Sequence, residues 1–321
     1  MIRQGTRSPD VRRLQVALNA RGLGPRLRVD GIYGRKTAAA VSRWKLSWGV
    51  RGDDGAYVTS GQLDVLASEA KLGGIPWTVP VGDWSGHQGD EDYAALAAAG
   101  DVGAIIKLTE GLYYKSGDAR VQLPEARKHM RFVDAYAFPG TRGRRKGKGR
   151  TPRTFGDPVV EAVTCYAYAQ EIGTPIDRFW LDGEAGLQKW SAFRRRSVPV
   201  MTRRAHTANA RWWLDWLEEM DRLHRGLTSG VYTSAPHVYA YIRLADPALL
   251  AELAARPLWF ANYPGKRRRF APFKSTAPWT RDDIDIWQWD GDAEIAAYDG
   301  PVDRNLARPE FVNTYPLKEA A

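Results

Sequence analysis

The chain has 321 residues, of which 44% are hydrophobic and 26% are charged. These values are those of a globular protein with enough apolar material for one large domain and a small module. The single cysteine, Cys165, excludes an intramolecular disulfide. No segment approaches the run of about 18 apolar residues that a membrane span needs, so we expect no membrane insertion.

The formal net charge of +10 favours polyanionic partners in general. Nucleic acid, acidic membranes and anionic wall polymers all fit this charge, which does not choose among them. The first residues, MIRQGTRSPDVRRL, contain no apolar segment of the kind found in a secretory signal peptide. We therefore expect synthesis in the cytoplasm without a signal peptide.

Residues 1–70 carry the pattern of a small three-helix domain. Asp10 is the expected N-cap of the first helix, and Asp30-Gly31 predicts a turn before the second. A third short helix fits residues 60–70. The apolar faces of the three helices contain Val11, Leu14 and Leu18, then Thr37, Ala40, Val41 and Trp44, then Leu63 and Leu66.

Residues 71–80 have Gly and Pro but no periodicity, which indicates a linker. From residue 81 to 321, apolar strand-like runs alternate with amphipathic helical segments. One helix is expected between its N-cap Asp157 and Gly173, and a longer one covers about 203–225. About eight such units favour an α/β fold, a modified (β/α) barrel of the TIM type, with its active groups at the carboxyl ends of the strands.

The segment FWLDGEAG, residues 179–186, places two carboxyl groups one residue apart at the end of an apolar run. Residues i and i+2 of a strand face the same side, so Asp182 and Glu184 are predicted to project together. Glycoside cleavage uses such a pair, because one acid holds a proton for the leaving oxygen while another stays ionised. Gly183 between them allows a bend and the close approach of a bulky ring. A solvated strand end and a metal site remain alternatives for this motif taken alone.

The other reactive residue types show no arrangement typical of a cofactor or metal site. The five histidines lack the spacing of metal ligands, and no glycine-rich phosphate loop is present. Cys165 lies on the apolar side of its helix, as a core residue does. The sequence therefore predicts neither a metal nor a cofactor.

Two stretches of the first domain, DVRRLQVALNARG and VDGIYGRKTAAAVSRWK, resemble the peptidoglycan-binding domain that accompanies many wall hydrolases. The matching residues are Asp10, Val11, Leu14, Gln15, Leu18, Asp30, Gly31, Gly34, Thr37, Ala40 and Val41. The resemblance covers about 60 residues and implies bacterial peptidoglycan as a partner. Most of these positions identify the fold rather than the ligand site.

The second domain contains eight short blocks in a fixed order. They are GDWSGHQG (82–89), IIKLTEG (105–111), AYAFPG (135–140), FWLDGE (179–184), GVYTS (230–234), LWFANY (258–263), IWQW (286–289) and GPVDRN (300–305). Together they resemble the lysozymes of glycoside hydrolase family 25, over about residues 81–310. One departure is Tyr136-Ala137-Phe138, where the family has Tyr-His-Phe.

This resemblance implies roles for four acids. Glu184 matches the general acid that protonates the bond between N-acetylmuramic acid and N-acetylglucosamine. Asp182 matches the second acid, either the nucleophile or the group that assists the N-acetyl oxygen of the substrate. Asp83 and Asp303 match acids that line the same cleft. The residues alone also allow Asp83 to be a turn acid and Asp303 to cap a turn with Asn305.

Four further residues are implied as substrate-binding groups. Glu110 is expected to form a hydrogen-bonding wall of the site, and Tyr136, Tyr232 and Trp287 match aromatic residues of the family groove. Aromatic rings suit the apolar faces of sugars, although each of these three rings could also belong to the core.

Outside the family pattern lies a strongly basic segment, residues 140–153. It is expected to form a solvated loop, with anionic wall polymers as a second partner. Because no nucleic-acid-binding signature accompanies the charge, no specific nucleic-acid partner is expected.

The sequence thus predicts a muramidase with a wall-binding module that acts at the cell wall, in the manner of a bacteriophage endolysin. A bacterial autolysin, a wall-binding protein without catalysis and a nucleic-acid-binding protein are the alternatives.

Overall fold

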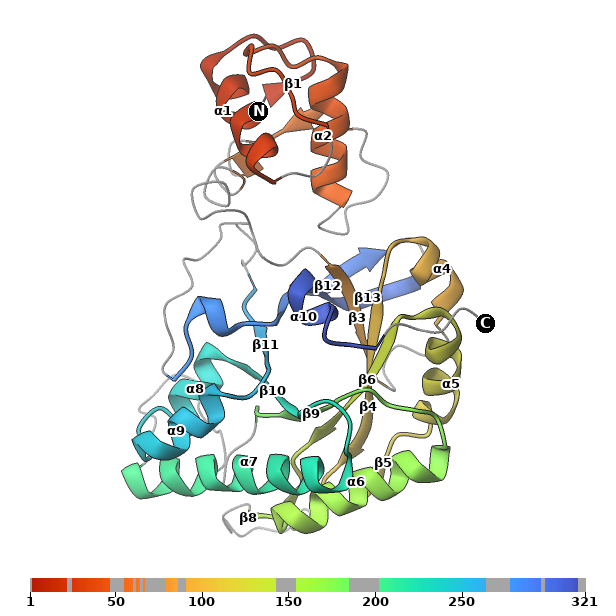
Figure 1. Cartoon of the computed structure of the whole chain (residues 1–321), viewed down its shortest axis with the longest axis vertical. Helices are drawn as coiled ribbons and strands as arrows, with labels where there is room; N and C mark the ends of the chain where they lie inside the picture. Colours follow the sequence, from red (N-terminus) through yellow and green to blue (C-terminus); the bar gives the residue numbers. More distant parts are fainter. Residues whose placement is uncertain are drawn as a thin grey trace, which may run out of the picture.

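The computed structural model describes residues 2–21, 25–46, 55–59, 62–63, 66, 79–85, 91–142, 154–184, 202–263, 278–295 and 298–316. Their buried side chains form one core cluster between Ile2 and Leu66, and two further clusters between Val81 and Tyr315. Figure 1 shows the elements of both parts. The expected linker at 71–80 lies outside the described residues except for its last two positions.

The amino-terminal part consists of two helices and a short antiparallel ribbon. Its elements are β1 (Ile2–Arg3), α1 (Pro9–Arg21), α2 (Arg35–Leu46) and β2 (Tyr57–Val58), with β1 paired to β2. Most of the expected third helix lies outside the described residues. Residues 62, 63 and 66 are helical, and Leu63 and Leu66 are buried as that helix required.

The expected cap of α1 is wrong by two residues. Ser8 rather than Asp10 caps this helix, because the Ser8 hydroxyl accepts the backbone N–H of Val11 at 3.3 Å. Pro9 then occupies the first helical position, where its fixed φ suits the helix and its missing N–H costs nothing.

The side chain of Gln15 contacts several of the motif residues of this domain. Its side-chain nitrogen donates to Asp30 Oδ1 at 2.8 Å and to Thr37 Oγ1 at 3.2 Å, and its oxygen accepts the N–H of Gly31 at 2.9 Å. Gly31 has a φ of +79°, and a Cβ there would lie 3.0 Å from the side chain of Arg12. One buried amide therefore fixes the turn that joins the two helices.

The second part is a closed barrel of eight strands. They are β3 (Val79–Trp84), β4 (Gly103–Glu110), β6 (Phe132–Phe138), β9 (Phe179–Asp182), β10 (Gly230–Ser234), β11 (Leu258–Ala261), β12 (Ile286–Ile295) and β13 (Tyr298–Ala307). The order in the sheet is β3-β13-β12-β11-β10-β9-β6-β4, and β3 also pairs with β4, which closes the barrel. The α/β barrel predicted from the sequence is thereby confirmed.

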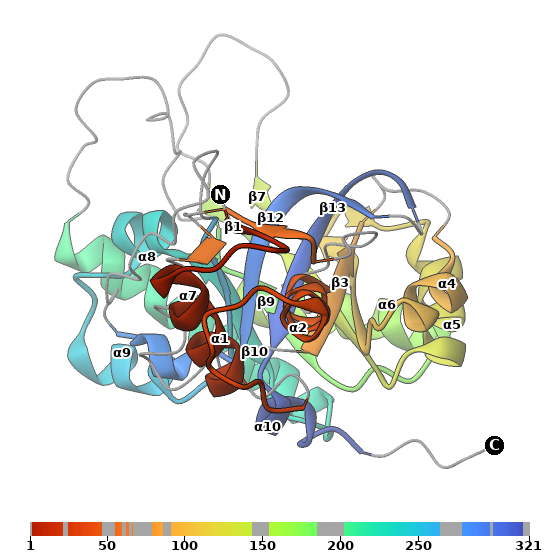
Figure 2. The ribbon, with the colours of Figure 1, turned by 90° about the horizontal axis from the view of Figure 1, so that it is seen from above.

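Strand β13 is the exception to parallel pairing. It runs antiparallel to both β12 and β3, whereas the other neighbouring strands of the barrel are parallel. Figure 2 shows β12 and β13 side by side next to β3. β13 brings residue 303 opposite residue 83 across the ladder.

Helices cover the outside of the barrel, except the last one, whose Phe311 and Val312 pack with the inner residues. They are α4 (Tyr93–Ala98), α5 (Ala119–His129), α6 (Pro158–Ile172), α7 (Arg203–Leu223), α8 (Ala235–Tyr241), α9 (Pro247–Ala254) and α10 (Pro309–Val312), with a 3₁₀ turn, η1 (Arg281–Asp283). Helix α6 has the cap that the sequence predicted: Asp157 accepts the N–H groups of Val159 and Val160, and Gly173 adopts the left-handed conformation. α6 and α7 pack along one side (Figure 1).

Two short ribbons leave the barrel. β5 (Tyr114–Lys115) folds back on the end of β4, and β7 (Thr141–Arg142) pairs with β8 (Thr154–Phe155). This second ribbon brackets the basic segment 140–153. Residues 143–153 of that segment lie outside the described residues.

Alternate residues of each strand face the inside and the outside of the barrel. The inward set includes Val81, Ile105, Phe132, Trp180, Tyr232, Trp259, Ile286 and Ala307, and the outward set includes Trp84, Ile106, Val133, Leu181, Val231, Phe260, Trp287 and Leu306. This alternation decides which predicted residues can reach a site inside the barrel mouth.

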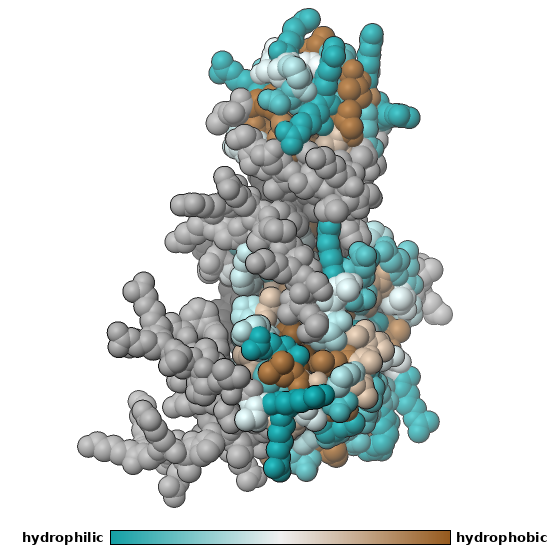
Figure 3. Space-filling view, turned by 90° about the vertical axis from the view of Figure 1, so that its left-hand side faces the viewer, coloured by the Kyte–Doolittle hydropathy of each residue, from teal (hydrophilic) through white to brown (hydrophobic). Residues whose placement is uncertain are grey.

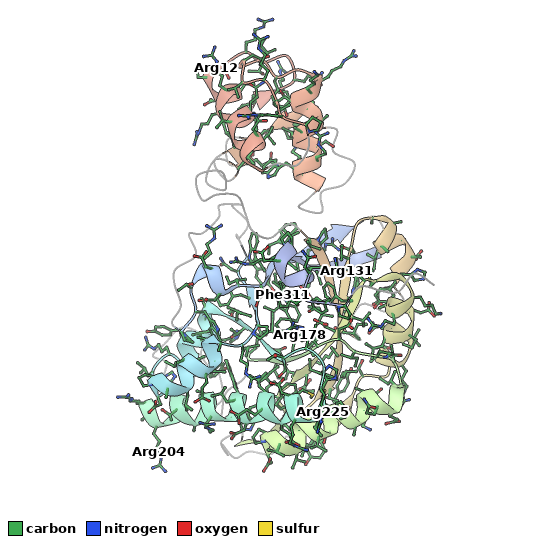
Figure 4. All side chains as sticks on the ribbon, viewed as in Figure 1. Arg12, Arg131, Arg178, Arg204, Arg225 and Phe311 are labelled. Atoms are coloured by element: carbon green, nitrogen blue, oxygen red, sulfur yellow. The ribbon has the colours of Figure 1, made fainter. Side chains whose placement is uncertain are left out.

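The amino-terminal end of the barrel is filled by side chains. Arg178 lies with its guanidinium 4.7 Å from the ring of Phe311, and Phe132 stacks on Tyr315 at 4.2 Å. Figure 4 shows Arg178 and Phe311 near one another. A substrate is therefore expected to enter from the carboxyl end of the strands. None of the helices in the described part of the chain has the length and apolarity needed to cross a membrane.

Candidate active site

Asp83 and Asp303 are cross-strand partners at the carboxyl end of β3. They face each other in the ladder of β3 and β13, and their side chains share a hydrogen bond. Asp83 Oδ2 also accepts the side-chain amides of Asn305 at 2.7 Å and Gln288 at 3.0 Å. The side chain of Asn305 thus hydrogen-bonds to Asp83, and the alternative in which Asp303 caps a turn with Asn305 does not hold.

Burial controls the charge of Asp83. Its side chain is 5% exposed, and loss of water raises the pKa of the carboxyl to about 6. The amides of Asn305 and Gln288 act in the opposite direction, because they favour the ionised form. The hydrogen bond with Asp303 acts in the same direction as these amides, so burial is what raises the pKa of Asp83.

Asp182 and Glu184 lie at the end of β9, as the sequence predicted. Asp182 is the last strand residue, and its Oδ1 accepts the backbone N–H of Glu184 at 3.2 Å. Gly183 between them donates its N–H to the carbonyl of Tyr232 at 2.7 Å, which ties the segment to β10. A Cβ on Gly183 would lie 2.7 Å from the ring of Trp213 on α7, so a bulky ring does approach this glycine.

The two acids at this strand end differ in exposure. Asp182 is 7% exposed, whereas the side chain of Glu184 is 31% exposed. Burial, and then the neighbouring charge of Glu184, raise the pKa of Asp182 well above its usual value, while Lys107 lowers it. Two carboxyls in unequal surroundings are the arrangement in which one can carry a proton while the other is ionised.

Two tyrosines lie within electrostatic reach of the acids at the strand ends. Tyr136, on the inner face of β6, has its pKa raised well above the usual value by burial and then by Asp83, Asp182, Asp303 and Glu184. Tyr232 is 8% exposed on β10, and its pKa is raised by burial and by three of the same acids. Acids from β3, β9 and β13 thus meet at one end of the barrel, with both predicted tyrosines among them.

The side chain of Gln288 joins Asp83 to two tyrosines of this site. Its amide nitrogen donates to Asp83, and its oxygen accepts the hydroxyls of Tyr232 at 2.7 Å and Tyr263 at 2.6 Å. The ring of Tyr263, after β11, is also close to Gly291. Although the whole residue is 49% exposed, burial of its hydroxyl end raises the pKa of Tyr263.

Glu110 and Trp287 are placed differently from the four acids. Glu110 is 49% exposed at the end of β4 and pairs with Lys107 at 3.5 Å, so it lies at the rim. Trp287 is 3% exposed on the outer face of β12, and its indole N–H donates to the carbonyl of Asn262 at 3.0 Å. The expected place of Trp287 in the substrate groove is therefore wrong, because its neighbour Gln288 faces the acids instead.

The departure from the family motif at Tyr136-Ala137-Phe138 does not alter the mouth of the barrel, because the residue that differs faces outward. Ala137 is 4% exposed and belongs to the cluster outside the barrel, whereas Tyr136 faces inward. The residue that departs from the family pattern therefore does not contribute to the polarity of the acid site.

Several residues of the site were not singled out from the sequence. Lys107, Tyr263, Gln288 and Asn305 lie within the quoted motif blocks, which is the signal that could have identified them. His237 had no such signal. Its Nδ1 lies 3.2 Å from Glu184 Oε1 and 2.7 Å from the hydroxyl of Ser234.

This arrangement combines a partly exposed carboxyl, a buried neighbour and further acids that repel anions and attract positive charge. It suits acid-assisted cleavage through a transition state with cationic sugar character. Within the part of the chain that the structure describes, no three or more His, Cys, Asp and Glu side chains are grouped so as to hold a metal ion.

Two family models match the chain. The model for glycosyl hydrolases family 25 matches residues 82–297, and the model for a peptidoglycan binding domain matches residues 7–55. No curated protein sequence matches.

Solved structures with the same fold have low sequence identity. A muramidase from Acremonium alcalophilum is 19% identical with a TM-score of 0.52, covering 74% of this chain and 98% of that one. A family GH25 lysozyme from Aspergillus fumigatus is 17% identical with a TM-score of 0.51, with coverages of 74% and 98%. The catalytic domain of endolysin ply40 from bacteriophage P40 of Listeria monocytogenes is 17% identical with a TM-score of 0.50, with coverages of 74% and 96%. These similarities establish the barrel fold.

The two matched domains define the class of protein, a glycoside hydrolase of the lysozyme type that acts on peptidoglycan. The chain belongs to glycosyl hydrolases family 25.

Proposed function

We propose that the protein cleaves the β-1,4 bond between N-acetylmuramic acid and N-acetylglucosamine in bacterial peptidoglycan. The observation that carries this proposal is the gathering of Asp83, Asp182, Glu184 and Asp303 at one end of the barrel. The opposite end is filled by side chains. A glycan strand that reaches these acids meets both a proton donor and fixed negative charge.

Glu184 is the general acid in this proposal. Its greater exposure gives its carboxyl access to the glycosidic oxygen, which takes the proton as the bond to the sugar breaks. Asp182 then acts either as the nucleophile or as the carboxylate that orients the N-acetyl oxygen of the substrate. Burial and the charge of Glu184 raise the pKa of Asp182, so a proton on Glu184 removes one of these two causes and lets Asp182 ionise beside Lys107.

The remaining predicted residues shape the site. Asp83 and Asp303 set the negative field beside Asp182. Tyr136 and Tyr232 offer rings and hydroxyls to the sugar, and Glu110 at the rim offers a hydrogen-bonding carboxylate.

We further propose that the protein is a phage endolysin, made in the host cytoplasm and acting at the wall. Its support is the order of the motif blocks and the pairing of a wall-binding module with the barrel. An endolysin catalytic domain shares the fold. A bacterial autolysin that reaches the wall by another route is the second candidate.

Anionic wall polymers are proposed as a second partner. The described part of the amino-terminal domain supports this, because long hydrophilic side chains project between apolar patches on the face seen in Figure 3, and Arg12 projects from the domain (Figure 4). Its exposed basic residues are Arg3, Arg7, Arg12, Arg13, Arg26, Arg28, Arg35 and Lys36. Such a surface attracts phosphate-bearing polymers in a salt-dependent manner.

The test is clearing of purified peptidoglycan by wild type and by Glu184→Gln. The variant keeps the shape of the side chain but has no proton to donate, so the rate is expected to fall about 10²–10⁴-fold. Glu171→Gln is the matched control, because Glu171 is exposed on α6 and pairs only with Lys115 and Arg120 among the described ion pairs.

Three results bear on the proposal. Full activity of Glu184→Gln would remove this residue from the mechanism. No clearing by the wild type would favour the alternative of a wall-binding protein without catalysis. A loss shared by Glu171→Gln would show a general effect of substitution.

A further inference from the structure

His237 lies beside the proposed acid. It occupies the first turn of α8, directly after β10, and its Nδ1 is 3.2 Å from Oε1 of Glu184. The side chains of His237 and Glu184 are 17% and 31% exposed, so their contact is partly shielded from water. This contact joins two titratable groups across two strands of the barrel mouth.

Two neighbours fix the imidazole in place. Ser234, which caps α8, has its hydroxyl 2.7 Å from the same Nδ1. Tyr241, one helical turn further along α8, lies parallel to the imidazole with an interplanar angle of 1° and ring centroids 6.0 Å apart. The Ser234 hydroxyl can donate to Nδ1 when the ring is neutral, and when Nδ1 carries a proton its N–H faces both this hydroxyl and the carboxylate of Glu184. The surroundings therefore tolerate both protonation states.

The charges near the pair come from a small set of groups. Those that act on the neighbours of Glu184 or on Glu184 itself are Asp83 from β3, Lys107 from β4, Tyr136 from β6, Asp182 from β9, Tyr232 from β10, Tyr241 from α8, Tyr263 after β11, Asp303 from β13 and His206 from α7. Burial raises the pKa of each of these tyrosines and lowers the pKa of His206, so these residues are neutral near pH 7. Asp83, Asp182, Asp303 and Lys107 are thus the remaining ionisable neighbours within this set.

A partly exposed general acid faces a chemical difficulty. Carboxyl groups in water are ionised at neutral pH, whereas a general acid has to carry a proton when the substrate is bound. An imidazole in contact with a carboxylate holds a proton to higher pH than the carboxylate does alone. When two such groups interact strongly, their protons belong to the pair rather than to either residue.

We propose that His237 and Glu184 share the catalytic proton and that this pair, rather than Glu184 alone, sets the alkaline limit of activity. The inference rests on the proposed role of Glu184. The proton passes from Nδ1–H of the imidazolium to the carboxylate of Glu184, which leaves a neutral ring and a neutral carboxyl. Glu184 then gives this proton to the glycosidic oxygen, which keeps the electron pair of the breaking bond. When water attacks the sugar, Glu184 accepts a proton from it and the pair is restored.

In this proposal His237 is a positioning residue that also supplies protons, and the two roles can be separated. Asparagine places an amide close to the position of Nδ1, so His237→Asn can still orient Glu184 but cannot titrate. His237→Ala removes both the contact and the proton.

The experiment measures initial rates of reducing-end release from soluble peptidoglycan fragments as a function of pH, at constant ionic strength. For His237→Asn, the alkaline limb of the rate profile is expected to move by about one unit toward lower pH, with a maximum that falls less than in His237→Ala. For His237→Ala, the same shift is expected together with a maximum about tenfold lower, because the acid is also less well positioned. His129→Asn is the control, since His129 is exposed on α5, and its profile is expected to match the wild type.

Two outcomes would overturn the proposal: a His237→Asn profile that coincides with the wild type, or one that is lower by the same factor at every pH. A loss of fold is separated by the NMR chemical shifts of the His237 ring nitrogens in wild type and in Glu184→Gln, which needs no His237 variant. These shifts are expected to differ between the two proteins, and equal shifts would contradict the pairing. Should Glu184→Gln keep full activity, the proposed role of Glu184 fails, whatever the His237 profiles show; only a wild type that does not clear peptidoglycan would contradict the proposed function itself.

Discussion

Replacement of Asp83 by asparagine should stabilise the protein while it disables the site. In Asp83→Asn, the side-chain oxygen would still accept the amides of Asn305 and Gln288, because both bonds go to the single atom Oδ2 of Asp83. The new amide would face Asp303, whose side chain already shares a hydrogen bond with this residue. The substitution therefore removes a buried charge without leaving its partners unsatisfied.

The size of the effect follows from the raised pKa. Burial moves the pKa of Asp83 from 3.8 to about 6, an interval of about two units. The folded state therefore binds more protons than the unfolded state in this range, and stability falls as pH rises through it. At about 1.4 kcal/mol per unit, the ionised Asp83 costs about 3 kcal/mol above pH 7. An asparagine does not titrate, so the variant does not carry this cost.

The assay is urea unfolding of wild type and Asp83→Asn, followed by the fluorescence of the buried tryptophans of the barrel. Measured at about pH 8 and about pH 4.5, the difference in unfolding free energy between the two proteins should be larger at the higher pH by about 2 kcal/mol. Comparison of the two pH values cancels any fixed packing effect of the substitution. A difference that does not change with pH, or that favours the wild type more at pH 8, would refute the reasoning.

Two further substitutions test the supports of the site. Gly183→Ala would place a methyl group 2.7 Å from the fully buried ring of Trp213. We therefore expect the free energy of unfolding to fall by about 1–3 kcal/mol and the rate of cleavage to fall about 10- to 100-fold. Unchanged activity would show that this close approach does not position the acids. Arg304→Met leaves the carboxylate of Asp101 buried without its partner and should cost about 3–5 kcal/mol in urea unfolding. The double variant with Asp101→Leu should recover most of this loss, and an equal loss in both would contradict the ion-pair explanation.

The sequence predicted the barrel because local signals were strong and agreed. Apolar runs gave the strands, and the cap at Asp157 and the left-handed Gly173 marked both ends of α6. The reversal of β13 was not predicted. Ile295 and Tyr298 are paired at a hairpin, and such a short connection can only join antiparallel strands, because a parallel crossover requires a dozen or more residues.

The sequence was sufficient to predict the part of the candidate site in which two acids lie at the end of the same strand. Asp182 and Glu184 lie together because residues i and i+2 leave a strand on the same side. The prediction for Trp287 was wrong because the motif identifies a block of residues and not the face of the strand on which each residue lies. Only the register of β12 shows that Gln288 faces inward and its neighbour Trp287 outward.

His237 illustrates what a sequence without coordinates does not reveal. It lies 53 positions after Glu184, and its contact depends on the pairing of β9 with β10 and on the turn into α8. Neither its neighbours in sequence nor its residue type distinguish it from the other histidines.

The central claim, that this site breaks the bond on the muramic acid side, is tested most directly by mass spectrometry of borohydride-reduced products. Peptidoglycan digested by the wild type should yield reduced N-acetylmuramic acid at the new ends, and the same digest with Glu184→Gln should yield almost none. Reduced N-acetylglucosamine ends, or free peptide amines with intact glycan strands, would contradict the account.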